Sequence, residues 1–152
     1  MNIFQKEIRD ICQSFNKHHV RYLLVGGFAV NYHGYPRSTG DLDLWIDPGD
    51  DNKRNLIDAL QSLNYDTEEL KQLDLVGAPP IDIPLQNFKI ELIPFLSSSL
   101  SFDDAFNAAI GGYMDGVLIK VIHLHHLIQL KSNSNRLQDA LDVEELKKRN
   151  KL

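Results

Sequence analysis

The sequence predicts an α/β (α+β) fold, a small mixed and twisted sheet with helices packed mainly on one face. Two patterns support it: short runs in which apolar and polar residues alternate, and longer segments whose apolar residues recur at helical spacing. Of the 152 residues, 43% are hydrophobic and 24% are charged, which suffices for a sizeable core. We therefore expect a single domain over residues 1–152.

The first half of the chain predicts, in order, a helix, a strand, a short helix, a strand and a helix. These elements span residues 3–16, 21–25, 28–33, 41–46 and 51–63. The first helix has an apolar stripe that contains the only cysteine, so we expect a packed thiol and no intrachain disulfide or thiolate zinc site. The stripe consists of Phe4, Ile8, Ile11, Cys12 and Phe15.

The second half begins with a segment that has no clear periodicity. Residues 66–87 contain one glycine and three prolines that break regular elements, so only Leu75-Val76 and Ile81–Ile83 are candidates for short edge strands. A strand, a helix, a strand after the hairpin-type turn Asp115-Gly116, and two closing helices follow. They span residues 88–93, 102–109, 117–122, 123–132 and 136–148.

The overall charge limits the class of partner. A formal net charge of −5 argues against a general nucleic-acid binder, which usually carries a surplus of basic residues. No apolar stretch approaches the length of a membrane span, and the first residues lack the apolar segment of a signal peptide. We therefore expect a cytoplasmic protein with no membrane partner.

A glycine pair, Gly26-Gly27, lies between an expected strand and the short helix. Glycine lets the backbone approach a ligand, and the free N–H groups at the start of the following helix favour phosphate. The competing interpretation is a tight turn without a ligand, which is common for glycines at a strand end.

Two carboxylates share one side of the expected strand 41–46. Asp41 and Asp43 alternate with Leu42 and Leu44, so the acids lie side by side on one face. Like charges at that spacing repel unless a cation lies between them, and Mg²⁺ is typically held by one or two carboxylates together with substrate phosphates. A solvated strand face is the alternative, but the apolar neighbours indicate burial, where unpaired carboxylates are costly.

A third carboxylate is needed to hold a second metal ion or to activate a nucleophile. Glu91 is the preferred candidate because it alternates with apolar residues in strand 88–93, as the aspartates do in theirs. Asp82 is the competitor, although the prolines near it favour an edge or loop position.

Together these residues resemble the DNA polymerase β-like nucleotidyltransferase superfamily. Gly26-Gly27, thirteen intervening residues, Asp41-Leu42-Asp43 and the later acid Glu91 match its pattern. More narrowly, the chain resembles the small bacterial nucleotidyltransferases related to abortive-infection toxins and to the minimal nucleotidyltransferases. The similarity covers residues 20–146 and includes Ser97–Ala105, Asp115–Val117, His126–Lys131, Arg136, Asp139 and Asp142.

The resemblance implies the nucleotidyltransferase fold and the transfer of a nucleoside monophosphate from a nucleoside triphosphate to a hydroxyl acceptor, with release of pyrophosphate. The acceptor would be RNA, protein or a small molecule. Asp41, Asp43 and Glu91 would be catalytic and would hold two Mg²⁺ ions, for which Mn²⁺ can substitute. Glu91 would also help to deprotonate the acceptor hydroxyl.

The expected nucleotide-binding residues are Gly26, Gly27, Arg37, Ser38, Thr39 and Lys131. Members of the superfamily often have serine at the position of Gly27, so Ser38 and Thr39 are candidates to supply the missing hydroxyl. The third acid is often aspartate, and Glu91 is longer. Arg37 precedes the aspartates and is placed to clamp phosphate; a solvated loop arginine is the alternative.

Lys131 shares a helical face with Leu124, Leu127 and Ile128 and therefore points inward. An inward lysine needs a negative partner, which a triphosphate would provide, and Asp139 is a candidate to orient it. The alternative is a lysine that reaches past the rim of the core to water.

Other interpretations stay open from the sequence alone. A weakly catalytic or non-catalytic protein, such as the antitoxin-type partner of a toxin–antitoxin pair, would fit the missing serine and the acidic composition. A drug-modifying nucleotidyltransferase with a small hydroxyl acceptor is a third possibility. Trp45 is expected in the core rather than against a base. We expect no metal site at His123, His125 and His126.

Overall fold

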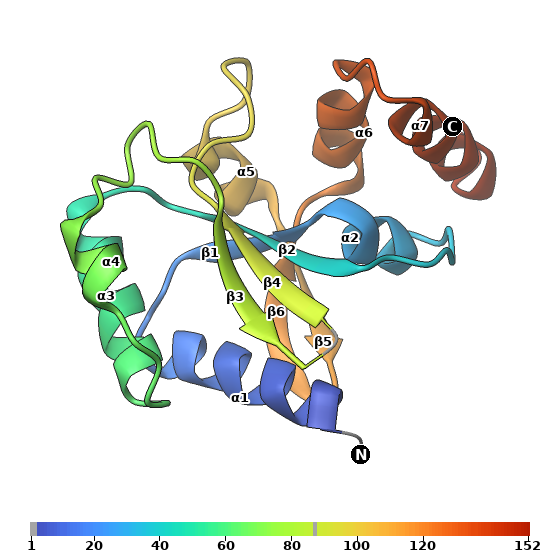
Figure 1. Cartoon of the computed structure of the whole chain (residues 1–152). Helices are drawn as coiled ribbons and strands as arrows, with labels where there is room; N and C mark the ends of the chain where they lie inside the picture. Colours follow the sequence, from blue (N-terminus) through green and yellow to red (C-terminus); the bar gives the residue numbers. More distant parts are fainter. Residues whose placement is uncertain (1–2, 87) are drawn as a thin grey trace.

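The computed structural model describes residues 3–86 and 88–152, with side chains from Lys6 onward. Within these residues, six strands form one sheet flanked by seven helices (Figure 1). The elements are α1 (Ile3–Lys17), β1 (Tyr22–Val25), α2 (Gly26–Tyr32), β2 (Asp41–Ile46), α3 (Asp50–Gln61), α4 (Glu68–Gln72), β3 (Ile81–Leu85), β4 (Phe88–Ile93), α5 (Phe102–Ala108), β5 (Ile110–Met114), β6 (Val117–Val121), α6 (Leu124–Ser132) and α7 (Leu137–Arg149).

The strands lie in the order β3-β4-β2-β1-β6-β5. The pairs β1–β6 and β2–β4 are parallel, and the other three neighbouring pairs are antiparallel. The predicted mixed sheet is thus confirmed. β2, which carries the two aspartates, is a central strand, so backbone hydrogen bonds on both sides hold it in place.

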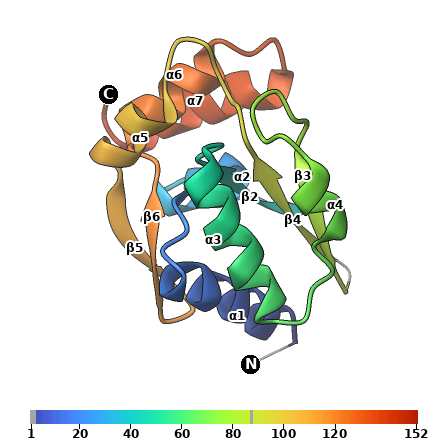
Figure 2. The same cartoon turned by 90° about the vertical axis from the view of Figure 1, so that its left-hand side faces the viewer.

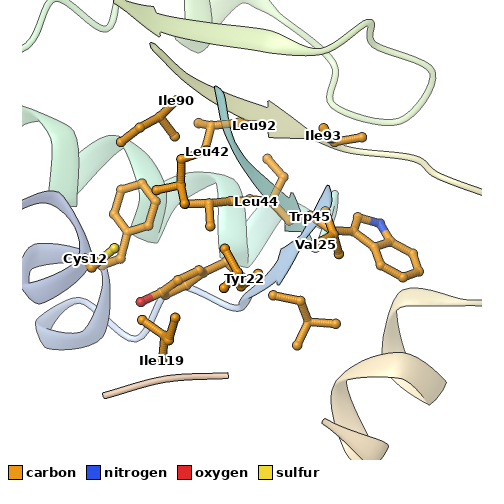
Figure 3. Packing of buried hydrophobic residues seen from close by; sticks show 14 of the residues in the cluster. Cys12, Tyr22, Val25, Leu42, Leu44, Trp45, Ile90, Leu92, Ile93 and Ile119 are labelled. Carbon is orange, nitrogen blue, oxygen red and sulfur yellow. The ribbon is translucent and has the colours of Figure 1, made fainter. Parts of the chain in front are cut away.

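The sheet face toward α1 and α3 is apolar. Its fully buried side chains include Leu42, Leu44, Ile90 and Leu92, which lie near Cys12 of α1 (Figure 3). α1 and α3 lie beside one another against this face (Figures 1 and 2), so the predicted helix packing is confirmed. Because side chains alternate along a strand, this register sends Asp41 and Asp43 to the opposite face.

Part of that opposite face is covered by α5. Trp45 of β2 is only 2% exposed and packs edge-on against Phe102 of α5, with 5.4 Å between the ring centroids. Trp45 is therefore a core residue, as predicted. The part of the face around the aspartates is left to form the wall of a cavity.

The structure corrects one expectation in the segment 66–87. Leu75 and Val76 lie in a bend and a turn, not in a strand, because the chain turns at Gly77, whose φ is +84°. Leu75 is buried in the core and Val76 is 68% exposed. β3 confirms the expected edge strand, and Pro84 is tolerated there because β3 has a neighbour on one side only. Asn87, in the same segment, lies outside the described residues.

Two short elements are not predicted by the sequence. α4 has five residues, too few to show a helical period. β5 contains Gly111 and Gly112, which weaken a strand pattern. The ring of Tyr32 packs over Gly112, where a Cβ would lie 2.9 Å from it and would displace this exposed side chain.

The first helix carries its apolar stripe as predicted, and Cys12 is fully buried in it. The side chain of Phe4, also assigned to the stripe, lies outside the described residues. None of the helices in the described part of the chain is long and apolar enough to cross a membrane.

Candidate active site

The three predicted metal-binding acids meet on one face of the sheet. β2 and β4 run parallel in a register that sets Asp43 opposite Glu91. One carboxylate oxygen from each of Asp41, Asp43 and Glu91 lies within 4.8 Å of the others. Among the residues the structure describes, no other set of three acid, histidine or cysteine side chains converges in this way. In particular, the three histidines around the start of α6 do not.

Asp82, the competing third acid, does not join this cluster. β3 sets it opposite Glu91 in register. Its exposed carboxylate instead accepts a hydrogen bond from Lys89 Nζ at 3.3 Å. Glu91, not Asp82, therefore completes the group of three.

The acid cluster is electrostatically unfavourable by itself. Burial raises the pKa of Asp43, and the carboxylates of Glu91 and Asp41 raise it further, to about 6. A divalent cation among the three carboxylates would remove this repulsion. Because every donor atom is a carboxylate oxygen, the set fits Mg²⁺ or Mn²⁺.

The glycine pair is required by side chains that approach it. Gly26 has a φ of +67°, and a Cβ there would run into the Asp43 carboxylate. A Cβ at Gly27 would come within 3.0 Å of the Thr39 side chain and 3.4 Å of Arg37 Nη1. The pair therefore lets the start of α2 lie directly against both the acid cluster and the loop that precedes β2.

A cavity of about 1010 Å³ opens over the acids. Its wall includes all the residues that were predicted from the sequence to bind metal or nucleotide. These are Gly26, Gly27, Arg37, Ser38, Thr39, Asp41, Asp43, Glu91 and Lys131. Ser38 is exposed and Thr39 half-buried at this wall. The structure thus brings the glycine turn, the acids and the two cations, Arg37 and Lys131, to a single cavity.

The two cations are held by carboxylates of α7. Arg37 donates through Nε and Nη2 to the two oxygens of Asp142, each at 2.8 Å. Lys131 Nζ lies 2.9 Å from Asp139 and 2.9 Å from Asp142. Lys131 is thus an inward lysine in contact with the expected partner Asp139, and Arg37 is anchored rather than solvated.

These acids differ from the cluster on β2 and β4 in their pKa. Burial tends to raise the pKa of Asp139 and Asp142. Hydrogen bonds and nearby positive charge outweigh it and hold both pKa values below the ordinary range. For Asp139 the donors are Ser134 and Lys131, and for Asp142 they are Arg37, Lys131 and Gln138.

Sequence reasoning assigned no role at the site to several residues that line the cavity or support it. Asp142 is fully buried beneath the two cations. Its spacing of three residues from Asp139 on one helix was a usable signal. Arg136, at the start of α7, lines the cavity and makes no ion pair within the described residues. Phe95, 63% exposed, also lines the cavity and carries no sequence signal.

Comparison with known proteins agrees with this geometry at the level of the fold. No protein-family model matches the chain, and no curated protein matches it in sequence. Among solved structures, the lincomycin-bound lincosamide antibiotic adenylyltransferase LnuA is similar with a TM-score of 0.54 and 15% identity over 93% of this chain and 95% of that chain. An antigenic nucleotidyltransferase-like protein from Paracoccidioides brasiliensis is similar with a TM-score of 0.57 and 15% identity, over 93% of this chain and 73% of that chain. The chain therefore has the nucleotidyltransferase fold.

Proposed function

We propose that this protein is a metal-dependent nucleotidyltransferase that transfers a nucleoside monophosphate from a nucleoside triphosphate to a hydroxyl group and releases pyrophosphate. The main support is the convergence of Asp41, Asp43 and Glu91 within 4.8 Å at the wall of a cavity that also contains Arg37 and Lys131. Three crowded acids beside two cations suit a ligand that carries both metal ions and phosphates.

The acids carry the chemistry in this proposal. Asp41, Asp43 and Glu91 would hold two Mg²⁺ ions, which supply charge neutralisation for the phosphates and lower the pKa of the acceptor hydroxyl. Glu91 takes the proton of that hydroxyl. The hydroxyl oxygen bonds to the α-phosphorus while the bond to the pyrophosphate oxygen breaks, and positioning supplies most of the acceleration.

The nucleotide would lie against the glycine turn and the cations. The proposed contacts are Gly26, Gly27, Arg37, Ser38, Thr39 and Lys131, to which we add Arg136 because it lines the cavity and makes no direct ion pair within the described residues. Asp139 and Asp142 would not touch the nucleotide. They orient Lys131 and Arg37 by the contacts described above.

We propose a small hydroxylated molecule as the acceptor, in preference to RNA. RNA binding relies on free basic groups along the phosphate backbone, whereas Arg37 and Lys131 are both engaged by carboxylates. The narrower relationship to abortive-infection toxins, with a toxin or antitoxin as protein partner, is a further proposal that rests on the sequence resemblance.

Transfer is tested with each of the four labelled nucleoside triphosphates, Mg²⁺ and a cell extract as the source of acceptor. We expect label to move from one triphosphate into the small-molecule fraction of the extract. The double variant Asp41→Ala/Asp43→Ala should abolish the transfer. Asp82→Ala, which removes an acid from the same sheet face but outside the cluster, is the matched control and should be active.

The same experiment separates the alternatives. Label in the RNA or protein fraction would retain the enzyme and replace the acceptor. If no label moves, and wild-type and double-variant proteins bind Mg²⁺ and triphosphates equally, the enzyme proposal is wrong. A non-catalytic partner protein, identified by a stable complex with the product of an adjacent gene, would then be the better explanation.

A further inference from the structure

The side chain of Thr39 fills the space that a side chain on residue 27 would need. A Cβ built on Gly27 would come within 3.0 Å of both Thr39 Oγ1 and Thr39 Cβ. Gly27 is buried, and both residues line the cavity. A threonine hydroxyl therefore stands where a side chain of the glycine turn would otherwise begin.

A second hydrogen-bond donor reaches the same point. Arg37 Nη1 lies 3.4 Å from the position of that Cβ. One of its two hydrogens goes to the backbone oxygen of Ser38, at 3.0 Å. The Thr39 hydroxyl donates to the backbone oxygen of Asp41 at 3.2 Å, which is at the long end for such a bond. Because a hydroxyl rotates freely, this donor can be redirected to a ligand.

The charges around the cavity increase the importance of a neutral donor. Arg37 and Lys131 carry two positive charges, and Asp139 and Asp142 offset both of them. These four residues therefore contribute little net charge, so near Arg37 a phosphate is attracted less through net charge than through directed hydrogen bonds. A hydroxyl in the wall provides such a bond without the cost of burying another charge.

We propose that Thr39 Oγ1 and Arg37 Nη1 together bind a phosphate of the triphosphate that is not transferred, and that Thr39 can take this position because residue 27 is glycine. This inference rests on the proposed function and makes it more specific. Thr39 becomes a substrate-binding residue whose partner is Gly27. A side chain on residue 27 and the threonine at 39 are mutually exclusive in this arrangement.

The proposed phosphate contacts are tested by calorimetry, which measures the binding of inorganic tripolyphosphate and of ATP, each with Mg²⁺. Tripolyphosphate is independent of the base, which the structure does not define. Thr39→Val keeps the shape of the side chain and removes the hydroxyl, so we expect about tenfold weaker binding of both probes. Thr39→Ser should bind as the wild type does. Thr67→Val, the other threonine and far from the cavity, should leave binding unchanged.

A hydroxyl exchange gives the sharper test. Gly27→Ser alone should weaken binding because the new side chain collides with Thr39, and Thr39→Gly alone should weaken it through loss of the donor. The double variant Gly27→Ser/Thr39→Gly should recover most of the affinity, since a serine hydroxyl then occupies the vacated space. Thermal melts of each variant show whether it is folded.

Three results would overturn the inference in different ways. Wild-type affinity in Thr39→Val would show that the hydroxyl does not contact the phosphate. The proposed function would still stand in that case if Asp41→Ala/Asp43→Ala abolishes transfer. A folded double variant that binds no better than the single variants removes the steric link between residues 27 and 39. If the wild-type protein binds neither tripolyphosphate nor any nucleoside triphosphate, both this inference and the proposed function are wrong.

Discussion

The acids of the sheet and the acids of α7 lie close to the same cavity, but the surrounding chain compensates their negative charge to different extents. Asp41, Asp43 and Glu91 are crowded together, and the pKa of Asp43 rises to about 6. Asp139 and Asp142 are more deeply enclosed, yet cations hold their pKa values below the ordinary range. The chain does not supply enough positive charge to offset the first group of carboxylates, whereas it does so for the second group. Burial of acids therefore does not itself mark a ligand site; incomplete compensation does.

The largest effect should come from Asp43→Asn, which tests the first half of this comparison. We expect nucleotidyl transfer to fall by at least about a thousandfold, because metal-bound charge contributes several kcal/mol to such a transition state. Without metal at pH 8, however, the variant should be more stable than the wild type by about 1 kcal/mol, after discounting for solvent around a half-buried carboxyl. Urea unfolding and single-turnover transfer measure the two changes. A destabilised variant would show that Asp43 is compensated within the chain.

Asp142→Asn tests the second half and should be destabilising. Removing the charge leaves Arg37 and Lys131 without their shared partner in a buried setting, which typically costs about 3 kcal/mol. Glu145→Gln is the control on the same helix, because its pair with Arg149 is more exposed and should be worth about 0.5 kcal/mol. Equal midpoints of urea unfolding in the two variants would contradict the contrast.

The two groups should also respond to pH with opposite signs. The pKa of Asp43 is raised, so its contribution to stability is fully present below the ordinary value of 3.8 and is lost as pH rises through about 6. The pKa values of Asp139 and Asp142 are lowered, so their contribution is present above 3.8 and is lost as pH falls further.

Millimolar Mg²⁺ should offset the loss at Asp43. We expect the increase in Tm on adding Mg²⁺ to be near zero at pH 4 and to reach about 3 °C above pH 7. Thermal melts across this range, with Ca²⁺ and Na⁺ as controls, measure it. A Mg²⁺ effect that is independent of pH would mean that the ion binds away from Asp43.

The smallest effect is expected at Arg136, which belongs to neither group. Arg136→Ala should weaken triphosphate binding by about threefold to tenfold, as removal of an exposed phosphate contact does, with no change in unfolding free energy. Arg54→Ala, on the exposed side of α3, is the matched control. Unchanged binding in Arg136→Ala would remove this residue from the site.

The sequence predicts where the three acids of the sheet lie better than it predicts which residues pair with the two cations. Alternation along β2 and β4 placed Asp41, Asp43 and Glu91 on strand faces, and both strands formed as expected. That the two strands are neighbours is a property of the sheet order, which no local pattern encodes. β5 was missed because two glycines dilute its pattern, and Leu75 shows that a buried apolar residue need not lie in a strand.

The partners of the cations were predictable only in part. Asp139 lies only eight residues from Lys131, across the short loop between the last two helices, so their contact is nearly local. The bond between Arg37 and Asp142 spans 105 residues, and the fit of Thr39 over Gly27 depends on how the loop before β2 folds back. Such contacts follow from tertiary packing rather than from propensity or period.

The link between Arg37 and Asp142 has a consequence for synthesis and folding. Contacts between distant parts of a chain form late, because closing a long loop must precede any gain from the contact. Before α7 packs against the rest of the domain, the sheet can already carry its three acids, but Arg37 and Lys131 have no carboxylates to orient them. Under the proposed function, we expect the metal-binding side of the cavity to form before the side that binds the triphosphate.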